Sequence, residues 1–505
     1  MTDEAAPASL LLKTATGTGW IIGWRLATRA LGLVSTLVLV RLLMPADFGL
    51  VALATSFAQA IEAFSWLGIE EAVIREKDPP RKVYDTAFTL NMIRGLVSGA
   101  VILGLAWPAG SFFSEPRMVE VLMVLALVIA LDGVENIGIV DFRREFAFRK
   151  EFQLWILPRL AGIVLTLALA AMFHSYWALI AGILAQRVLR VAFSYVMHPY
   201  RPRLSLQAWR GMLGYSLWTW AISSVGLLRN RADTILIGRM LNPAQVGIYS
   251  VGAEIAALPT TELVLPLCRA AFSGFSAGRH VEQTPGGTYL RIIGTMALLT
   301  LPAGVGISLV AEPLVALAFG AQWAQTAPLI EILALAGTVT VLGSMSATLF
   351  QVHGLMAGMF RIEAMALLLR VVLIAAGVQA AGLVGAAVAV AVAMAVEQGL
   401  YARVTFRQFD LRPGDLLRAT WRSLLATAAM AIALHATGLG WHRAGAGGWP
   451  PATGLGLGVV LGAMVYVAVL LASWLAAGRP AGAELDALAL LRRLLGQAAA
   501  RLRAG

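Results

Sequence analysis

The sequence predicts an all-α polytopic membrane protein with about fourteen transmembrane helices. Of its 505 residues, 59% are hydrophobic and only 13% are charged, whereas an ordinary soluble domain carries about 25% charged residues. One helical crossing of the bilayer takes roughly 20 residues. Only helices and closed barrels satisfy the backbone inside lipid, and the long apolar runs lack the alternation of barrel strands.

Fourteen apolar segments follow one another, each bounded by proline, glycine or charged residues. They cover approximately residues 15–43, 48–74, 86–113, 118–140, 153–173, 176–197, 212–241, 244–275, 288–319, 326–351, 362–378, 381–402, 420–438 and 454–477. No stretch between them is long enough for a separate globular domain. We therefore expect the protein to act among its helices.

An internal repeat appears when the sequence is shifted by 198 residues. Residues 34–51 lie over 232–249 with six identities, among them Pro45 over Pro243 and Gly49 over Gly247. The shift places the first helix on the seventh with the same orientation, which predicts a parallel repeat about the membrane normal. We expect a cytoplasmic N-terminus (1–14), two six-helix bundles (15–200 and 201–405), helices 13 and 14 (406–478) and a cytoplasmic amphipathic tail (479–505).

Lysines and arginines indicate the orientation. Of the 39 basic residues, 25 lie in loops on one side and 4 on the other, and the remaining 10 lie inside predicted helices. The positive-inside rule then places both termini in the cytoplasm. Topology thus accounts for the net charge of +11, which gives no reason to expect nucleic acid.

Residue counts exclude several other functions. A single cysteine, Cys268, cannot form an intramolecular disulfide, and no histidine cluster has the spacing of a zinc site. None of the four lysines lies in the Gly-Lys-Ser/Thr of a phosphate-binding loop. We therefore expect no ATP, no metal and no cofactor, apart from a coupling ion such as H⁺ or Na⁺.

Four short motifs together resemble the polysaccharide repeat-unit flippases (Wzx-like) of the MATE-like multidrug/oligosaccharidyl-lipid/polysaccharide exporter superfamily. They are Val40–Gly49, Asp85–Phe88, Phe142–Phe148, and Arg231–Arg239 followed by Gly247–Ser250. The resemblance covers most of residues 10–410 and is weak over the last two helices. It implies two bundles that form a V around a central cavity and open alternately to each side.

The same resemblance implies a cargo and a place in the cell. The cargo would be an undecaprenyl-diphosphate-linked oligosaccharide, moved from the cytoplasmic to the periplasmic leaflet of a bacterial inner membrane. The product would be exopolysaccharide, capsule or O-antigen of lipopolysaccharide. The bilayer and a polysaccharide polymerase would be its partners.

Arginines deep inside the predicted helices are the candidate binding residues, because a buried charge normally faces a cavity or a partner. A guanidinium stays protonated and grips phosphate oxygens, so these arginines would bind the diphosphate. They are Arg25, Arg29, Arg94, Arg229 and Arg231. The alternative is structural pairing, as between Arg229 and Asp233 four residues apart. For Arg187 and Arg190, near the cytoplasmic helix end, we expect snorkelling.

Acidic residues inside the predicted spans would either pair with these arginines or carry a coupling ion. The candidates are Asp233, Glu62, Asp132 and Glu135. Three features outside this set carry further expectations. Residues 141–152 are predicted to form an interfacial helix, residues 483–502 to lie on the inner leaflet, and the glycines at 454, 458 and 462 to permit close packing with a helix or a partner.

Two other classes of protein compete with a transporter of lipid-linked sugar. A cation-coupled antiporter of small molecules would need an acidic or aromatic cavity instead of arginines. A membrane enzyme, either a polymerase or a lipid-dependent glycosyltransferase, usually has a sizeable external loop or an acidic motif. The longest external loop, residues 439–453, contains no acid. We therefore do not expect an enzyme.

Overall fold

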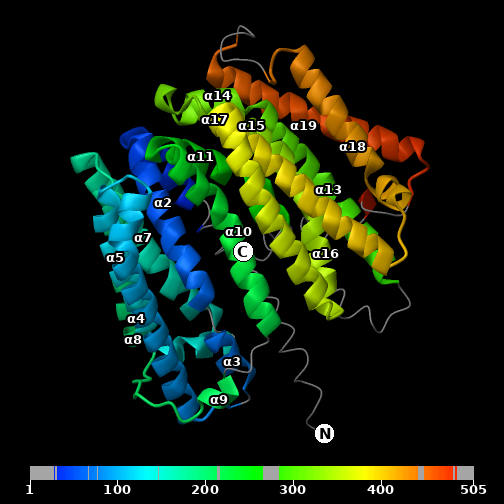
Figure 1. Cartoon of the computed structure of the whole chain (residues 1–505). Helices are drawn as coiled ribbons and strands as arrows, with labels where there is room; N and C mark the ends of the chain where they lie inside the picture. Colours follow the sequence, from blue (N-terminus) through cyan, green and yellow to red (C-terminus); the bar gives the residue numbers. More distant parts are fainter. Residues whose placement is uncertain are drawn as a thin grey trace, which may run out of the picture. The chain divides into compact units, whose positions relative to one another are not determined.

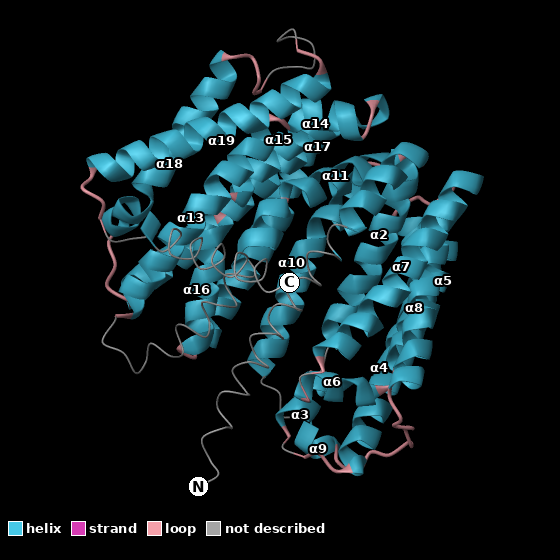
Figure 2. Cartoon of the chain, turned by 180° about the vertical axis from the view of Figure 1, so that it is seen from behind, coloured by secondary structure: helices cyan, strands magenta, loops and turns pink. Residues whose placement is uncertain are grey.

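A computed structural model describes residues 28, 31–65, 68–76, 78–145, 147–212, 217–264, 284–441, 449–480 and 484–485. Within these residues every regular element is a helix, which confirms the predicted all-helical class (Figures 1 and 2). The chain forms two compact units, Met1–Gly247 and Ile248–Gly505. The predicted division into bundles stays a prediction.

In the first unit, long helices pack side by side as α4 with α5, α7 with α8, α5 with α8, and α2 with both α5 and α10. The elements are α2 (Pro45–Glu62), η1 (Ala63–Ser65), α3 (Ile69–Arg75), α4 (Arg81–Phe112), α5 (Arg117–Gly133), η2 (Ile137–Val140), α6 (Asp141–Arg144), α7 (Phe148–Phe173), α8 (Trp177–Met197), α9 (Trp209–Met212) and α10 (Leu217–Met240). The next helix, α11 (Pro243–Ala256), crosses the boundary between the units.

In the second unit, α13 packs against α15 and α18, α17 against α15 and α16, and α18 against α19. The elements are η3 (Thr260–Val264), α13 (Pro285–Leu309), α14 (Ala311–Ala318), η5 (Ala321–Trp323), α15 (Thr326–Gly337), α16 (Thr340–Val352), α17 (Met356–Gln408), α18 (Pro413–Ala436) and α19 (Pro451–Ala476).

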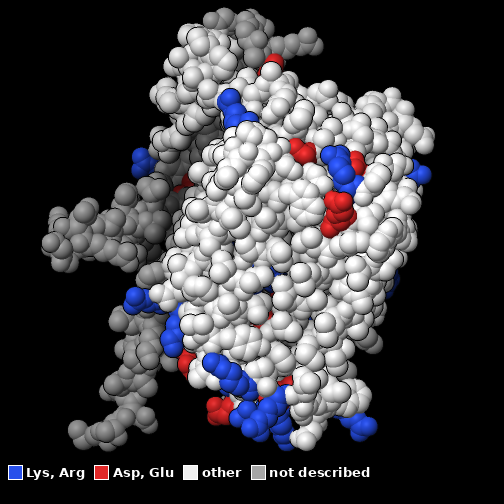
Figure 3. Space-filling view, turned by 90° about the vertical axis from the view of Figure 1, so that its left-hand side faces the viewer, with Lys and Arg blue, Asp and Glu red and all other residues white. Residues whose placement is uncertain are grey.

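Seven helices in the described part of the chain, with α17 counted once, are long and apolar enough to cross a membrane. An eighth arises if α15 and α16, which bend by 43° at their junction, count as one span. The side view of the first unit has a broad surface with few charges above a lower edge where Lys and Arg gather (Figure 3). These features agree with a multi-pass membrane protein, and the number fourteen remains a prediction.

Several predicted segments are interrupted, among them 288–319, where one helix ends at Leu309 and the next begins at Ala311. The segment 48–74 is not one continuous helix, because α2 ends at Glu62 and α3 begins only after Gly68, whose φ of 62° lies in the left-handed region. Residues 141–152 do not form one interfacial helix, since α6 ends at Arg144 and α7 begins at Phe148.

A break inside the long helix α17 coincides with a predicted boundary. Ala381 and Gly382 have non-helical dihedrals, and Gly382 has a φ of 58° and a ψ of −134°. Beyond this point the chain returns along itself, because a β-carbon on Gly385 would lie 1.9 Å from the carbonyl oxygen of Gly377. Residues on either side of the break therefore form a tight helical hairpin, with its turn between the predicted segments 362–378 and 381–402.

The repeated segments meet in the first unit at their matching glycines. A β-carbon on Gly49 would lie 1.6 Å from the carbonyl oxygen of Pro243, and one on Gly247 would lie 1.9 Å from that of Pro45. Each proline is the first residue of its helix, α2 or α11. The two helix starts therefore approach each other reciprocally, backbone against backbone, and each glycine leaves the space that the other helix occupies.

The glycines of α19 pack within the second unit. Gly454, Gly458 and Gly462 are buried, and the side chains nearest to them belong to Trp449, Val310 and Leu434 respectively. This face is therefore used for internal packing and is not left open for a partner. At the start of the predicted tail, Glu484 forms a bidentate ion pair with Arg422 of α18, with N–O distances of 2.5 and 2.9 Å. Most of the predicted tail lies outside the described residues.

Candidate functional site

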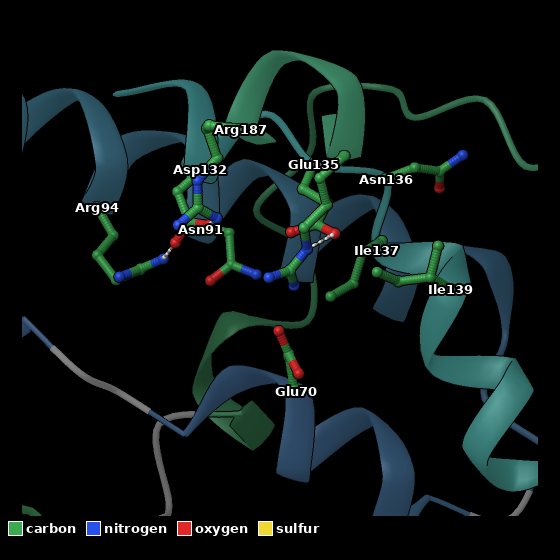
Figure 4. A pocket seen from close by; sticks show the side chains of 10 residues that line it. Glu70, Asn91, Arg94, Asp132, Glu135, Asn136, Ile137, Ile139 and Arg187 are labelled. Atoms are coloured by element: carbon green, nitrogen blue, oxygen red, sulfur yellow. Dashed lines mark hydrogen bonds and ion pairs between the residues drawn. The ribbon is translucent and has the colours of Figure 1, made fainter. Parts of the chain in front are cut away.

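A polar cavity of about 200 Å³ lies inside the first unit (Figure 4). Helices α3, α4, α5 and α8 and the turn after α5 contribute its lining. The lining residues are Glu70, Asn91, Arg94, Asp132, Glu135, Asn136, Ile137, Ile139, Arg187 and Arg190. Three arginines and three carboxylates balance in formal charge, so the cavity is highly polar without being strongly cationic.

Asp132 holds two arginines from different helices. Its Oδ2 atom lies 3.4 Å from Arg94 Nη2, and its Oδ1 atom accepts a hydrogen bond from Arg187 Nη1. The three side chains are only 16–26% exposed, which places the cluster largely out of solvent. In Figure 4 the two guanidinium groups converge on the carboxylate.

Close helix packing brings this ion pair together. A β-carbon on Gly95 would lie 2.7 Å from the Cα atom of Gly133, so α4 and α5 touch backbone to backbone. Each glycine is the immediate neighbour of a charged residue, Arg94 or Asp132. The small residues therefore let the two helices approach closely enough for the charges to meet.

A second ion pair lies one helical turn further on. Arg190 Nε donates to Glu135 Oε1 at 2.8 Å, and the two side chains are 15% and 11% exposed. The guanidinium of Arg190 also stacks on the ring of Trp155, 3.6 Å from its centroid. Contact with a carboxylate on one side and an aromatic face on another fixes the plane of this guanidinium.

One more acid lies near the cavity, and the lining residue Glu70 has a partner outside it. Glu62, at the end of α2, is close enough to interact electrostatically with Asp132, Arg94 and Arg187. Glu70 lies 3.4 Å from Arg143. The site therefore combines charges from helices far apart in the sequence, and its arginines have acidic side chains as neighbours.

The structure brings together four of the predicted site residues, Arg94, Asp132, Glu135 and Glu62. Arg25 and Arg29 lie outside the described residues. Their assigned role, like that of the other candidates, stays a prediction.

Three further candidates lie on α10. Arg231 and Asp233 attract each other electrostatically, and Asp233 is 5% exposed. Among the described residues, the buried Nε atom of Arg231 has no hydrogen-bond partner. Arg229 donates to Asn230 at 3.4 Å. The cavity lining, as far as the described residues define it, does not include these positions.

Arg187 and Arg190 correct the sequence analysis. Both were expected to extend towards the cytoplasmic surface, but they turn inward to Asp132 and Glu135. The spacing carried a signal for this arrangement, because the two arginines are three residues apart and so are the two acids. Equal spacing on two neighbouring helices allows a ladder of two ion pairs.

Outside the spans, a polar cluster surrounds Asp141. Its Oδ1 atom accepts hydrogen bonds from the Tyr84 hydroxyl and from Arg144 Nη1, the latter at 3.0 Å, and its Oδ2 atom lies 3.5 Å from His198 Nε2. Burial acts to raise the pKa of Asp141, but the hydrogen bonds from His198, Tyr84 and Arg144 outweigh it and hold that pKa below its ordinary value.

Comparison with known proteins identifies relatives of the chain. Residues 38–328 match the model of the polysaccharide biosynthesis protein family. The chain is 23% identical to the succinoglycan biosynthesis transport protein ExoT of Rhizobium meliloti over 63% of its own length and 65% of the relative's, which is just under two thirds. It is 24% identical to the lipopolysaccharide biosynthesis protein WzxC of Escherichia coli, covering 75% of this chain and 77% of that protein.

Solved structures share the fold. The lipid II flippase MurJ in an inward closed conformation superimposes with a TM-score of 0.71 at 12% identity, covering 89% of this chain and 98% of that one. An inward-facing multidrug transporter of the MATE family gives a TM-score of 0.61 at 17% identity, covering 76% and 94%. At these identities the likeness concerns the fold alone.

Proposed function

The chain belongs to the polysaccharide biosynthesis protein family, and we propose that it is a flippase that moves a lipid-linked oligosaccharide across the membrane. The observation that carries this proposal is the family match over more than half of the chain, together with relatives whose names place them in polysaccharide transport and synthesis. ExoT is named a transport protein, and we infer that this chain is a transporter rather than an enzyme.

The finer assignment rests on the resemblance to the polysaccharide flippases. The carrier is undecaprenyl diphosphate, and the cargo passes from the cytoplasmic to the periplasmic leaflet of a bacterial inner membrane by alternating access. Both termini are cytoplasmic. This orientation is supported by the positive-inside rule, because it places 25 basic loop residues on the cytoplasmic side. The proposed architecture has fourteen spans, in two six-helix bundles related by the repeat and two further helices.

The diphosphate is bound by arginines, for which Arg25, Arg29, Arg94, Arg229 and Arg231 are the candidates. Arg94 already holds the carboxylate of Asp132 at 3.4 Å. An arriving phosphate offers the same guanidinium a second anion with better bidentate geometry. Binding would then exchange one anion for another. The phosphate of the cargo would replace the Asp132 carboxylate at Arg94, and Asp132 would remain paired with Arg187.

Coupling to H⁺ or Na⁺ would use a carboxylate that loses an arginine partner in this exchange. Asp132, Glu135 and Glu62 lie within one electrostatic cluster, and Asp233 is the remaining candidate. Delivery of the flipped unit to a polysaccharide polymerase on the outer face would complete the pathway.

The function can be tested in proteoliposomes that contain a fluorescent undecaprenyl-diphosphate-linked oligosaccharide in both leaflets. A membrane-impermeant quencher measures how fast the label exchanges between the leaflets. We expect the wild-type protein to accelerate exchange, Arg94→Ala to lose most of this activity, and Arg94→Lys to regain part of it. Equal exchange in protein-free vesicles and in vesicles with the wild-type protein would contradict the proposal.

In cells, the position of the trapped intermediate separates a flippase from a polymerase. Deletion of a flippase leaves the lipid-linked unit in the cytoplasmic leaflet, whereas deletion of a polymerase leaves it in the outer leaflet. A periplasmic glycosidase that reaches the accumulated unit would therefore favour the polymerase.

A further inference from the structure

The segment that follows α8 is fastened to α4 along its backbone. This segment, residues 200–210, is here called the strap. Three of its amide groups donate to side chains on the first three turns of α4. The bonds run from Arg203 N–H to Asp85 Oδ1 (3.0 Å), from Ser205 N–H to Thr89 Oγ1 (2.9 Å) and from Ala208 N–H to Thr86 Oγ1 (3.2 Å).

Further hydrogen bonds orient the side chains that accept these bonds. The Thr86 and Thr89 hydroxyls each donate to the carbonyl four residues earlier, at 2.8 and 2.7 Å, which leaves their lone pairs for the strap. Asp85 is 7% exposed and also accepts from the Tyr200 hydroxyl at 2.5 Å. The Asp85–Phe88 motif, one of those that carry the family resemblance, thus holds the strap.

The strap has an inner and an outer side. Tyr200 and Ala208 pack against a buried cluster formed by α3, α4 and η2. Leu204, Leu206 and Trp209 do not belong to that cluster and are 67%, 46% and 43% exposed. Three large apolar side chains on one short segment are therefore exposed within the described part of the unit.

The charged side chains of the strap itself are all of one sign. Arg201, Arg203 and Arg210 are exposed, and residues 201–216 contain no acid. The guanidinium of Arg210 lies 5.6 Å from the centroid of the Trp209 ring. A tryptophan with leucines and arginines is the composition that sits at the boundary between headgroups and acyl chains.

The strap also lies at the right level for this boundary. It contacts α4 between Asp85 and Thr89, no more than about 12 Å along the helix axis from the first residue, Arg81. The rest of α4, as far as Phe112, is long enough to cross the hydrocarbon core. Lys and Arg gather at the lower edge of this unit in Figure 3.

We propose that the strap is a membrane-interfacial anchor that α4 holds in place. Leu204, Leu206 and Trp209 enter the boundary of the acyl chains, while the arginines contact lipid phosphates. Asp85, Thr86 and Thr89 are positioning residues that keep the strap at this depth. The proposal rests on the multi-pass membrane assignment and does not depend on the cargo.

Spin-label depth measurement tests this directly. The label is placed by Leu206→Cys in a Cys268→Ser background, and the full-length protein is reconstituted in vesicles of phosphatidylethanolamine and phosphatidylglycerol. Collision with oxygen, compared with collision with a water-soluble nickel chelate, reports depth. Labels at Asp78→Cys and Val97→Cys give the references, since Asp78 lies in an exposed loop and Val97 is an exposed residue midway along α4.

We expect the label at 206 to lie about 5–10 Å below the lipid phosphates, between the two references. Thr89→Val and Asp85→Ala should move it towards water and increase its mobility. Thr300→Val is the matched control, because its hydroxyl also donates to the carbonyl four residues earlier but lies on α13. That control should leave the label at 206 unchanged.

Two results would overturn the proposal. In the wild-type protein, nickel accessibility as high as that of the Asp78 reference would place the strap in water. Low accessibility to both oxygen and nickel would place it against protein. Neither result depends on transport, so a failed flippase assay with the expected depth would contradict the proposed function and leave the anchor intact.

Discussion

Replacing Gly49 with alanine should separate the starts of α2 and α11. The new β-carbon would lie 1.6 Å from the Pro243 carbonyl oxygen, whereas a carbon–oxygen contact normally requires about 3.3 Å, so the helices would have to part by roughly 1.7 Å. The opposing atom is backbone and cannot rotate away. Overpacking of this kind costs about 1–3 kcal/mol, which corresponds to about 2–4 °C of melting temperature per kcal/mol in a unit of this size.

The assay is thermal unfolding of the purified protein in nanodiscs, followed by tryptophan fluorescence, together with polysaccharide export in a deletion strain. Gly247→Ala should have a similar effect, because its β-carbon would lie 1.9 Å from the Pro45 carbonyl oxygen. The matched control is Gly104→Ala on α4, where a β-carbon meets no atom within 4 Å. There alanine should be neutral or stabilising, since it favours the helix by about 1 kcal/mol.

The reasoning fails if Gly49→Ala melts at the same temperature as Gly104→Ala and exports normally. A lower melting temperature for only one of the two glycine variants would contradict the reciprocal contact. If both variants melt lower and lose export together, the close approach is needed for the working structure.

Two further predictions concern charges. Arg187→Leu should destabilise the protein by up to about 3 kcal/mol, because Asp132 keeps only Arg94. In a double-mutant cycle with Asp132→Asn the losses should be smaller than additive, and simple additivity in urea unfolding would refute the pairing. The pKa of Asp141 is lowered in the folded protein, because its hydrogen bonds outweigh burial. The ionised Asp141 therefore stabilises the fold at pH values above the unfolded-state pKa of about 3.9, and this stabilisation is lost as the pH falls through the folded-state pKa. The melting-temperature gap between wild type and Asp141→Asn should narrow below about pH 4, and a constant gap would argue against this assignment.

Helix positions were predictable where local chemistry sets them. Prolines begin α2, α11, α13, α18 and α19, because proline lacks the amide hydrogen that the first turn leaves unused. The lengths of the apolar segments predicted the remaining long helices. The break in α17 was equally visible, since glycine at position 382 permits the positive φ that the turn requires.

The candidate site was only half predictable. The position of a residue along its helix correctly predicted that Arg94 is interior. The same criterion misplaced Arg187 and Arg190, because it does not consider the side chains on the neighbouring helix. Pairing depends on which helices are neighbours, and the contact between Gly95 and Gly133 sets that for α4 and α5. One sequence cannot specify such contacts between helices, although the matching spacing of acids and arginines points to them.

The hairpin in α17 has a consequence for how the protein enters the membrane. From Val371 to Val396 the sequence carries no charged residue, so its turn offers nothing that would hold it on either side during synthesis. The translocon would therefore have to release both arms together, once the second arm has emerged from the ribosome. Arg361 and Arg403, near the outer ends of the two arms, would then fix the orientation of the pair, and a charge placed at Ala381 would be expected to stall this joint insertion.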